Sequence, residues 1–325
     1  CQGEIQLPLS DCGVVALDYR GRAGIATSIG HAPQAALVDP AAGSILSIAE
    51  ALTNIVWAPL SEGLDSVSLS ANWMWPCKNE GEDARLYRAV EACSDFACSL
   101  GINIPTGKDS LSMTQKYGKD KVYSPGTVII SAGAEVSDIR KVVSPVLRTG
   151  IDSTVYYIDF SFDKLKLGGS AFAQSLDKIG KEVPTVQDSE YFANAFNAVQ
   201  ELINKELILA GHDISAGGMI TTMLEMNFAN TEGGLEVSLD EIPEKDLVKI
   251  LFSENPGILI QVEKTDEVEK ILKKAGVAFI RLARPCDERH LLIHKDGADY
   301  QFFIDHLRDV WFESSYLLDC KQSGE

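Results

Sequence analysis

Oxygen-bearing side chains gather around the start of one predicted helix. Asp39 directly precedes a stretch with helical apolar periodicity, and Glu50 and Asn54 lie within that stretch at i and i+4. Residues spaced by four leave the same face of a helix, so Glu50 and Asn54 project together. Carboxylate and amide oxygens are hard ligands, which suit Mg²⁺ rather than zinc. Spacing alone favours an Asp39 that only caps a helix with a solvated polar face, and a magnesium site is the alternative.

A glycine-rich segment, residues 211–218, carries a second candidate set. It lies between the apolar run 207–210 and a predicted helix, where backbone can approach a phosphate and the helix N-terminus favours negative charge. Asp213 could hold a bridging metal ion, and Ser215 could donate to a phosphate oxygen. The alternative is an ordinary strand-to-helix loop capped by Asp or Ser. For His212 we expect a hydrogen-bonded structural role rather than proton transfer.

Lys108 lies in a third polar segment, residues 105–113. Its Gly-Lys-Asp-Ser sequence superficially resembles a P-loop, but the glycine spacing of a P-loop is absent and a Walker fold is rejected. We expect a polar, glycine-containing turn in which Lys108 contacts an anion; a turn without any ligand fits the sequence equally well.

Two blocks of elements must position these residues. In the first block we expect strands at 13–18, 66–70 and 127–132 and helices at 44–57 and 83–100. In the second block we expect strands at 155–159, 257–262, 278–283 and 290–294 and a helix at 191–207. The turn-rich segment 144–154 is the expected linker. Because strands and helices alternate, we predict an α/β (α+β) protein with two domains, residues 1–148 and 149–325.

Composition narrows the classes of function. The 325 residues include 47 acidic and 29 basic side chains, a net charge of −18 that repels nucleic acid and anionic membranes. No apolar run is long enough to span a bilayer, and we recognise no export signal. Seven cysteines without a C-x-x-C pair favour a reducing cytoplasm. The chain opens on Cys1 rather than Met, and we expect an internal piece of a longer protein.

Two familiar motifs are absent from the sequence. No cysteine lies in a G-x-C-x-G nucleophile elbow, so the chain encodes no glutaminase centre. No G-x-G-x-x-G motif follows a predicted strand, which argues against a dinucleotide-binding fold.

The order and spacing of the polar segments resemble one family over nearly the whole chain. The similarity to the large, single-chain formylglycinamide ribonucleotide amidotransferases rests on residues 30–39, 48–54, 69–74 and 107–110, on 211–213 and on Ser215. The resemblance is to the second half of that family's synthetase region. It implies an aminoimidazole ribonucleotide synthetase-like fold, with an N-terminal α/β domain whose sheet pairs with a counterpart sheet and a C-terminal α/β domain.

The resemblance also implies ligands and a reaction. Asp39, Glu50, Asn54 and Asp213 would bind Mg²⁺, Val38 and Ser215 would contact ATP or ADP, and Lys108 is a weaker phosphate contact. The whole enzyme would be an ATP-dependent ligase of purine biosynthesis that uses glutamine as the amide donor. Its partners here would be the missing first synthetase half and the glutaminase domain.

One departure from the family pattern limits the assignment. The catalytic half carries an H-N-H-P signature, whereas this sequence has Gly30-His31-Ala32-Pro33 at the corresponding place. We therefore assign no catalytic residue and expect an auxiliary nucleotide site. Two alternatives stay open: a structural domain whose nucleotide site has decayed, and a self-sufficient homodimeric enzyme of the same superfamily. Separation from a sheet partner predicts self-association of the isolated chain.

Overall fold

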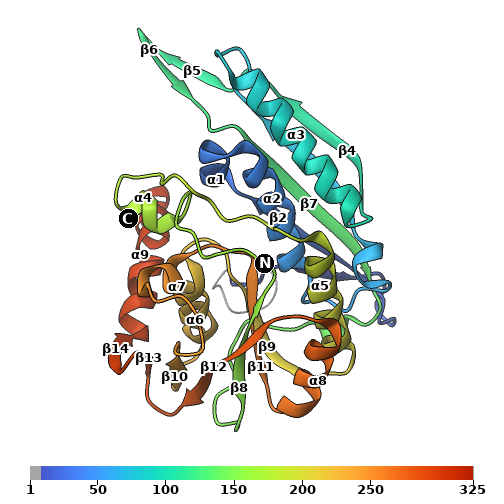
Figure 1. Ribbon diagram of the computed structural model, residues 1–325, viewed down its shortest axis with the longest axis vertical. Coiled ribbons are helices and arrows are strands. Elements are labelled where there is room, and N and C mark those ends of the chain that lie inside the picture. The colour runs from blue at the N-terminus through green and yellow to red at the C-terminus, as the bar shows by residue number, and fades with distance from the viewer. Residues whose placement is uncertain (1–8, 325) are drawn as a thin grey trace.

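The computed structural model describes residues 9–324 and consists of two sheets with helices around and between them (Figure 1). Cys1 and the outer limits of the two predicted domains, residues 1 and 325, lie outside this range. Within the described range, no helix has the length and apolar character needed to cross a membrane.

The first sheet has five strands in the order β1-β2-β7-β3-β4, antiparallel except for the parallel pair β3 and β4. Their bounds are β1 Gly13–Ala16, β2 Gly24–His31, β3 Ser68–Met74, β4 Asn103–Ser110 and β7 Thr127–Val136. A separate hairpin, β5 (Thr114–Tyr117) and β6 (Asp120–Tyr123), extends beyond it (Figure 1). Buried and exposed residues alternate strictly along β2, so the sheet has one packed face and one open face.

Three helices cover the packed face: α1 (Pro33–Val38), α2 (Pro40–Ile55) and α3 (Glu82–Ser99). The predicted helices 44–57 and 83–100 are thus confirmed as α2 and α3. Pro40 suits the first turn of α2 because its fixed φ is already helical. Close packing of α2 on β2 requires a glycine, since a Cβ on Gly30 would lie 2.2 Å from the carbonyl oxygen of Ser47.

The polar segment around Lys108 is a strand, so the prediction of a turn at 105–113 was wrong. Residues of β4 pair in parallel with β3, with Lys108 opposite Asn72. The strand lies at the edge of the sheet and is largely exposed, which is why its sequence is polar and lacks the alternation expected of a strand. The pairing comes from the crossover through α3, which a local sequence pattern does not reveal.

The second sheet has seven strands in the order β14-β13-β10-β12-β8-β11-β9, all antiparallel except the pair β10 and β13. Its strands are β8 Thr154–Asp159, β9 Ile208–Asp213, β10 Gly234–Ser238, β11 Gly257–Val262, β12 Phe279–Cys286, β13 His290–Lys295 and β14 Ala298–Phe303. The helices of this half are α4 Ala171–Ser175, α5 Ser189–Asn204, α6 Gly218–Phe228, α7 Leu247–Phe252, α8 Thr265–Ala275 and α9 Ile304–Ser323. The four strands predicted here are confirmed as β8, β11, β12 and β13.

One hydrophobic core runs from the first sheet into the second. It includes Leu52 of α2, Phe196 of α5 and Ile258 of β11, all of which are fully buried. Helix α5 lies between the two sheets, and its Phe192 packs edge-on against both Phe96 and Phe160. The two halves are therefore fixed against each other by packed side chains.

The segment predicted as a linker, residues 144–154, is tied to the second half. The side chain of Gln261 accepts from the backbone N–H of Arg148 at 2.8 Å and donates to the carbonyl oxygen of Arg148 at 2.7 Å. Leu147 is buried, and its N–H donates to Met226. This connection is consequently an ordered part of the fold.

Gln200 of α5 offers a test of how the halves are joined. Its amide accepts from Leu60 N and donates to the carbonyl oxygens of Val56 and Ala58, all at buried positions. We expect Gln200→Leu to lower the free energy of unfolding by about 3 kcal/mol, because three buried backbone groups lose their partners.

Urea denaturation of the purified chain measures this change. Gln174→Leu on the exposed face of α4 is the matched control and should change stability by less than about 0.5 kcal/mol. Equal effects of the two substitutions would show that the Gln200 bonds do not hold the halves together.

Candidate functional site

Two predicted metal ligands converge where the halves meet. Glu50 projects from α2 and Asp213 ends β9. Burial raises the pKa of Glu50 well above its usual value, and the neighbouring charge of Asp213 raises it further. Asn54, one turn further along α2, donates from Nδ2 to the carbonyl oxygen of Ile29 at 2.9 Å, which leaves its amide oxygen for another partner. The structure thus brings Glu50, Asn54 and Asp213 to one region.

Asp39 lies at the far end of α2. Its Oδ1 accepts from the backbone N–H groups of Ala41 and Ala42 at 2.9 and 3.3 Å, and Arg88 lies 3.8 Å away. At 1.5 Å of rise per residue, its Cα is about 16 Å from that of Glu50, too far for the two side chains to share one ion. The structure shows Asp39 as a helix cap.

The other two predicted contacts also lie apart. Val38 ends α1 and packs against the small apolar cluster of Ala35, Ala42, Leu46 and Val183. Lys108 lies on β4, where its ammonium group contacts the hydroxyl of Ser110. Neither residue lines the cavity next to Glu50.

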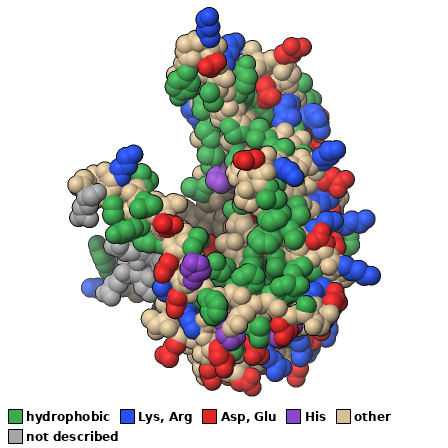
Figure 2. Space-filling model, turned by 90° about the vertical axis from the view of Figure 1, so that its left-hand side faces the viewer, with side chains coloured by type: hydrophobic (Ala, Val, Ile, Leu, Met, Phe, Trp, Pro, Cys, Tyr) green, Lys and Arg blue, Asp and Glu red, His purple; other side chains and the backbone are tan. Residues whose placement is uncertain are grey.

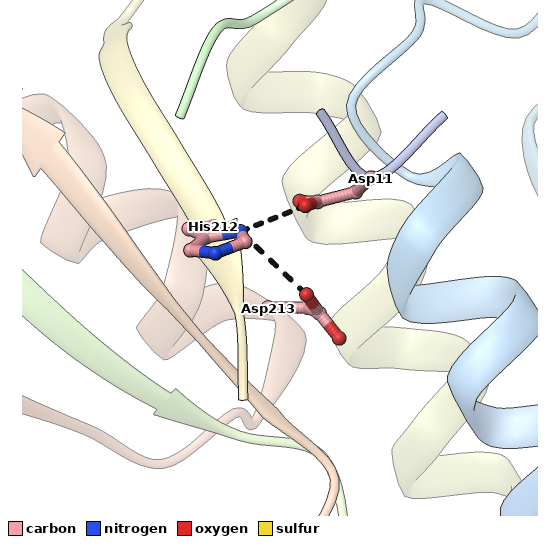
Figure 3. A group of neighbouring side chains, drawn as sticks. All are labelled: Asp11, His212 and Asp213. Atoms are coloured by element: carbon pink, nitrogen blue, oxygen red, sulfur yellow. Dashed lines mark ion pairs between the residues drawn. The ribbon is translucent and has the colours of Figure 1, made fainter. Parts of the chain in front are cut away.

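Asp11, which sequence reasoning missed, lies beside Asp213 where Asp39 was expected. It precedes β1, and its Oδ1 lies 2.7 Å from Nδ1 of His212 (Figure 3). The same nitrogen lies 3.6 Å from Oδ1 of Asp213, so the three side chains form one compact group that could hold a metal ion. Asp11 is about 200 residues from Asp213 in sequence and has no local motif around it, so only the tertiary structure reveals it.

The oxygen atoms of this group fit a cation. Oδ2 of Asp11 and Oδ2 of Asp213 are both buried and, among the described residues, have no hydrogen-bond partner. Nδ1 of His212 likewise has no hydrogen bond of normal geometry, although it lies within ion-pair distance of both carboxylates. Buried polar atoms are nearly always partnered, so three such atoms in one compact group require an explanation. The carboxylates of Asp11 and Asp213 are hard donors of the kind that Mg²⁺ prefers, and the Glu50 carboxylate is near enough for their charges to raise its pKa.

The charges of Asp11, His212 and Asp213 also favour a bound cation. Burial raises the pKa of Asp11 and also that of Glu254 nearby, and it raises the pKa of Asp213 to about 8. Burial alone would lower the pKa of His212, but Asp11 and the hydrogen bond to Glu225 outweigh it and raise that pKa well above 6.5. One imidazolium is too little positive charge for these carboxylates, and a bound divalent cation would supply the rest.

A cavity of ≈ 120 Å³ opens beside Glu50. Its walls come from His31–Ala35, the turn at Gly168 and Gly169, and the loop that carries Ser215. The size is below the roughly 300–1,000 Å³ of pockets for whole small molecules, so the enclosed part suits a fragment such as a phosphate group. Ser215 lines this cavity, and its contact with a phosphate stays a prediction.

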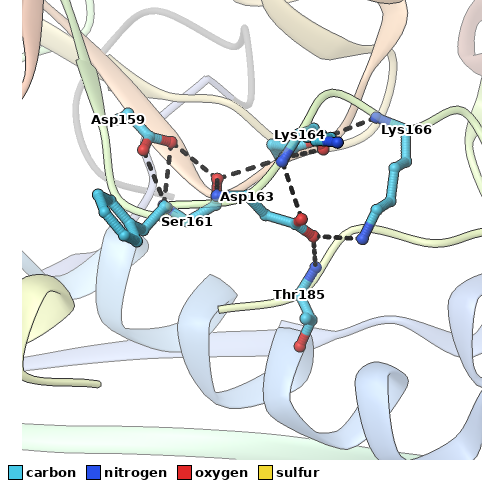
Figure 4. Close-up of polar contacts among 8 residues, drawn as sticks. Asp159, Ser161, Asp163, Lys164, Lys166 and Thr185 are labelled. Atoms are coloured by element: carbon cyan, nitrogen blue, oxygen red, sulfur yellow. Dashed lines mark hydrogen bonds and ion pairs between the residues drawn. The ribbon is translucent and has the colours of Figure 1, made fainter. Parts of the chain in front are cut away.

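Polar networks hold two walls of this cavity. Oε1 of Glu254 accepts from the N–H of Ala171 at 2.7 Å and of Gly217 at 2.8 Å, which joins the Gly168–Gly169 turn to the Ser215 loop. Further back, Asp159, Ser161 and Asp163 bond the loop after β8 to itself and to Thr185 (Figure 4). Sequence reasoning did not single out Glu254, because a lone Glu before a strand carries no distinctive pattern.

Comparison with known proteins identifies the two halves. Residues 1–135 match the FGAR-AT PurM_N-like domain, and residues 154–291 match the C-terminal domain of AIR synthase related proteins. The fold is shared with T. maritima PurL complexed with ATP (TM-score 0.70, 15% identity, covering 91% of this chain and 46% of that one). The chain therefore has the AIR synthase-related architecture that the sequence predicted.

Sequence relatives define the family more narrowly. The chain is 38% identical to "Probable phosphoribosylformylglycinamidine synthase, chloroplastic/mitochondrial" of Arabidopsis thaliana, over 98% of this chain and 23% of the relative. It is 36% identical to the Homo sapiens phosphoribosylformylglycinamidine synthase, over 99% of this chain and 24% of the relative. The chain belongs to the phosphoribosylformylglycinamidine synthase family and spans about a quarter of the length of these relatives.

The buried carboxylates predict an unusual pH dependence. Because the pKa of Asp213 is raised to about 8 from an ordinary 3.8, the folded protein holds a proton that the unfolded chain has released. The resulting stability is complete below the ordinary pKa and is lost as pH rises through the folded pKa. We expect the free energy of unfolding of the cation-free protein to fall between about pH 5 and about pH 8.

Urea denaturation in EDTA at the two pH values tests this. Asp213→Asn should flatten the pH dependence, whereas Asp39→Asn should leave it unchanged, since Asn caps a helix as well as Asp. A wild-type slope retained in the Asp213 variant would mean that this carboxyl stays ionised in the fold.

Proposed function

We propose that the chain binds Mg²⁺ together with ATP or ADP where the two halves meet. Asp11, Glu50, Asn54 and Asp213 are the metal ligands, and Ser215 faces the phosphates. The two buried, unpartnered carboxylate oxygens of Asp11 and Asp213 carry the proposal, because a cation is the partner that satisfies both. Magnesium would neutralise the phosphate charge in a chain that is itself strongly acidic.

The site suits holding a nucleotide better than reacting with it. His31 lines the cavity, but Ala32 and Pro33 follow it where the catalytic half of the family has a second histidine. No other histidine lines this cavity in the part of the chain that is described. We infer that this is the auxiliary nucleotide site, whose occupant keeps the two halves together.

The larger context follows from the relatives. They are named phosphoribosylformylglycinamidine synthases, and the T. maritima PurL structures include complexes with ATP, ADP and FGAR. We propose that the chain is part of an ATP- and glutamine-dependent ligase that amidates formylglycinamide ribonucleotide in purine biosynthesis. Its partners would be a first synthetase half and a glutaminase domain on the same polypeptide.

Domain limits and compartment are part of this proposal. We place the domain boundary at residues 148 and 149, between β7 and β8. The six cysteines in the described range are all free, which suits a reducing compartment such as the cytoplasm. The name of the Arabidopsis thaliana relative gives chloroplast and mitochondrion for that protein.

Calorimetric titration with Mg²⁺–ADP tests the site. Wild type should bind without steady hydrolysis of ATP. Asp11→Asn and Asp213→Asn should each weaken binding by about tenfold to a hundredfold, since each removes a charged ligand from the ion.

Asp39→Asn is the control and should bind like wild type, because Asp39 only caps α2. The proposal fails if all three variants bind as wild type does, or if a wild type shown to be folded by circular dichroism binds nothing. Loss of binding in Asp39→Asn and Asp213→Asn, but not in Asp11→Asn, would restore the ligand set expected from sequence.

The open face of the first sheet predicts self-association of the isolated chain. Val15, Ile25 and Ile29 project from β1 and β2 into solvent, and each is about half exposed or more. Exposed apolar side chains on one flat sheet favour a second copy or the counterpart sheet. We expect a concentration-dependent dimer, weakened by Ile29→Glu.

Light scattering at micromolar concentration measures this assembly. Leu317→Glu on α9 alters an equally exposed apolar residue away from the sheet and serves as the control. A wild type that stays monomeric, or a stronger effect of the Leu317 substitution, would contradict sheet-to-sheet association.

A further inference from the structure

A continuous line of polar contacts joins the last helix to the proposed metal site. Nε1 of Trp311, on α9, donates to Oε1 of Glu225 at 3.0 Å. The other oxygen of Glu225, Oε2, lies 2.9 Å from Nε2 of His212. Nδ1 of His212 lies 2.7 Å from Oδ1 of Asp11. Glu225 and His212 are each contacted at both of their polar ends, so neither can turn without breaking a contact.

Asp11 needs such support more than the other proposed ligands do. Asp213 belongs to a paired strand and Glu50 to a four-turn helix, so their backbones are fixed by regular hydrogen bonds. Asp11 lies before the start of β1 in a bend without regular structure. The direction of its carboxylate is therefore set by contacts with the end of β9, where His212 contacts Oδ1. The other oxygen, Oδ2, is buried and has no hydrogen-bond partner among the described residues.

We propose that His212, Glu225 and Trp311 are positioning residues that aim the free oxygen of Asp11 at the cation. His212 acts as the pivot, because its two ring nitrogens face Asp11 and Glu225 on opposite sides. Glu225 is in turn held by its hydrogen bond from Trp311, whose ring packs against Phe228 at a centroid distance of 5.5 Å. The inference rests on the proposed Mg²⁺–nucleotide site and adds residues that act on it without touching the ligand.

Through these contacts, the position of α9 also affects the orientation of Asp11. Trp311 and Leu307 pack against the core of the second half, whereas Tyr316, Leu317 and Leu318 further along are exposed. On the face shown in Figure 2, a narrow lobe with several hydrophobic side chains stands apart from the body of the molecule. A displacement of α9 would release Glu225 first and, through His212, the orientation of Asp11.

Trp311→Phe tests the line, because it removes the Nε1 donor and keeps a ring on Phe228. Trp75→Phe is a matched control: Nε1 of Trp75 donates to Glu82 at 2.9 Å, the same kind of bond away from the site. Two measurements are made on each folded variant. One is the Mg²⁺–ADP affinity by calorimetry, and the other is the rate of alkylation of Cys12, which follows Asp11 and reports movement of that segment without any nucleotide.

We expect Trp311→Phe to weaken Mg²⁺–ADP binding about fivefold to tenfold and to speed alkylation of Cys12 by a similar factor. Trp75→Phe should change neither value, and the exposed Cys98 should react equally in all samples. Combining Trp311→Phe with Glu225→Gln should weaken binding no further than Glu225→Gln alone, because both break the same line.

The outcomes separate this inference from the proposed function. If Trp311→Phe matches Trp75→Phe in both measurements, or if the Trp311 and Glu225 effects add, the line does not position Asp11. If wild type binds no Mg²⁺–ADP, the proposed function fails, and the Cys12 rates alone decide whether Trp311 fixes the Asp11 segment.

Discussion

Buried carboxylates that share a single imidazolium are the constraint on which the site depends. An ionised group withdrawn from water must be paired, hydrogen bonded or protonated, because an isolated buried charge costs several kcal/mol. Glu225 meets this condition through His212 and Trp311. Asp11 and Asp213 meet it for only one oxygen each, and protonation or a cation must satisfy the rest.

These carboxylates are buried because the fold packs the two halves closely against each other. Gly211 of β9 lies so close to the ring of Trp57 that a Cβ there would be 2.1 Å from it, and the ring follows directly after α2. That contact sets the end of β9 against α2 and so places Asp213 near Glu50. The shared core of α2, α5 and β11 excludes water from the junction. A rigid, dry junction makes the carboxylates costly to leave without a partner.

Local sequence patterns predicted what depends on local structure. Periodicity gave α2 and therefore the common face of Glu50 and Asn54. Asp213 was expected in a glycine-rich loop before a helix, whereas it ends strand β9. Asp39 entered the expected ligand set because aspartate serves both as a helix cap and as a metal ligand, and the structure shows it as the cap of α2. Asp11 was missed because its partners lie about 200 residues away, and β4 was missed because an exposed edge strand has no apolar alternation. These features arise from tertiary contacts.

In the proposed site, the glycine-rich loop before α6 leaves the nucleotide's charge to the metal ion rather than to the helix terminus. The sequence predicted that the backbone of this loop can approach a phosphate, yet the N–H of Gly217 already donates to Glu254. A phosphate placed there would meet the Glu254 carboxylate and would have to displace it. Approach from the side of Asp11, Glu50 and Asp213 avoids that conflict once a divalent ion neutralises the carboxylates. The acidic residues that would repel a free phosphate are then the ones that bind its metal complex.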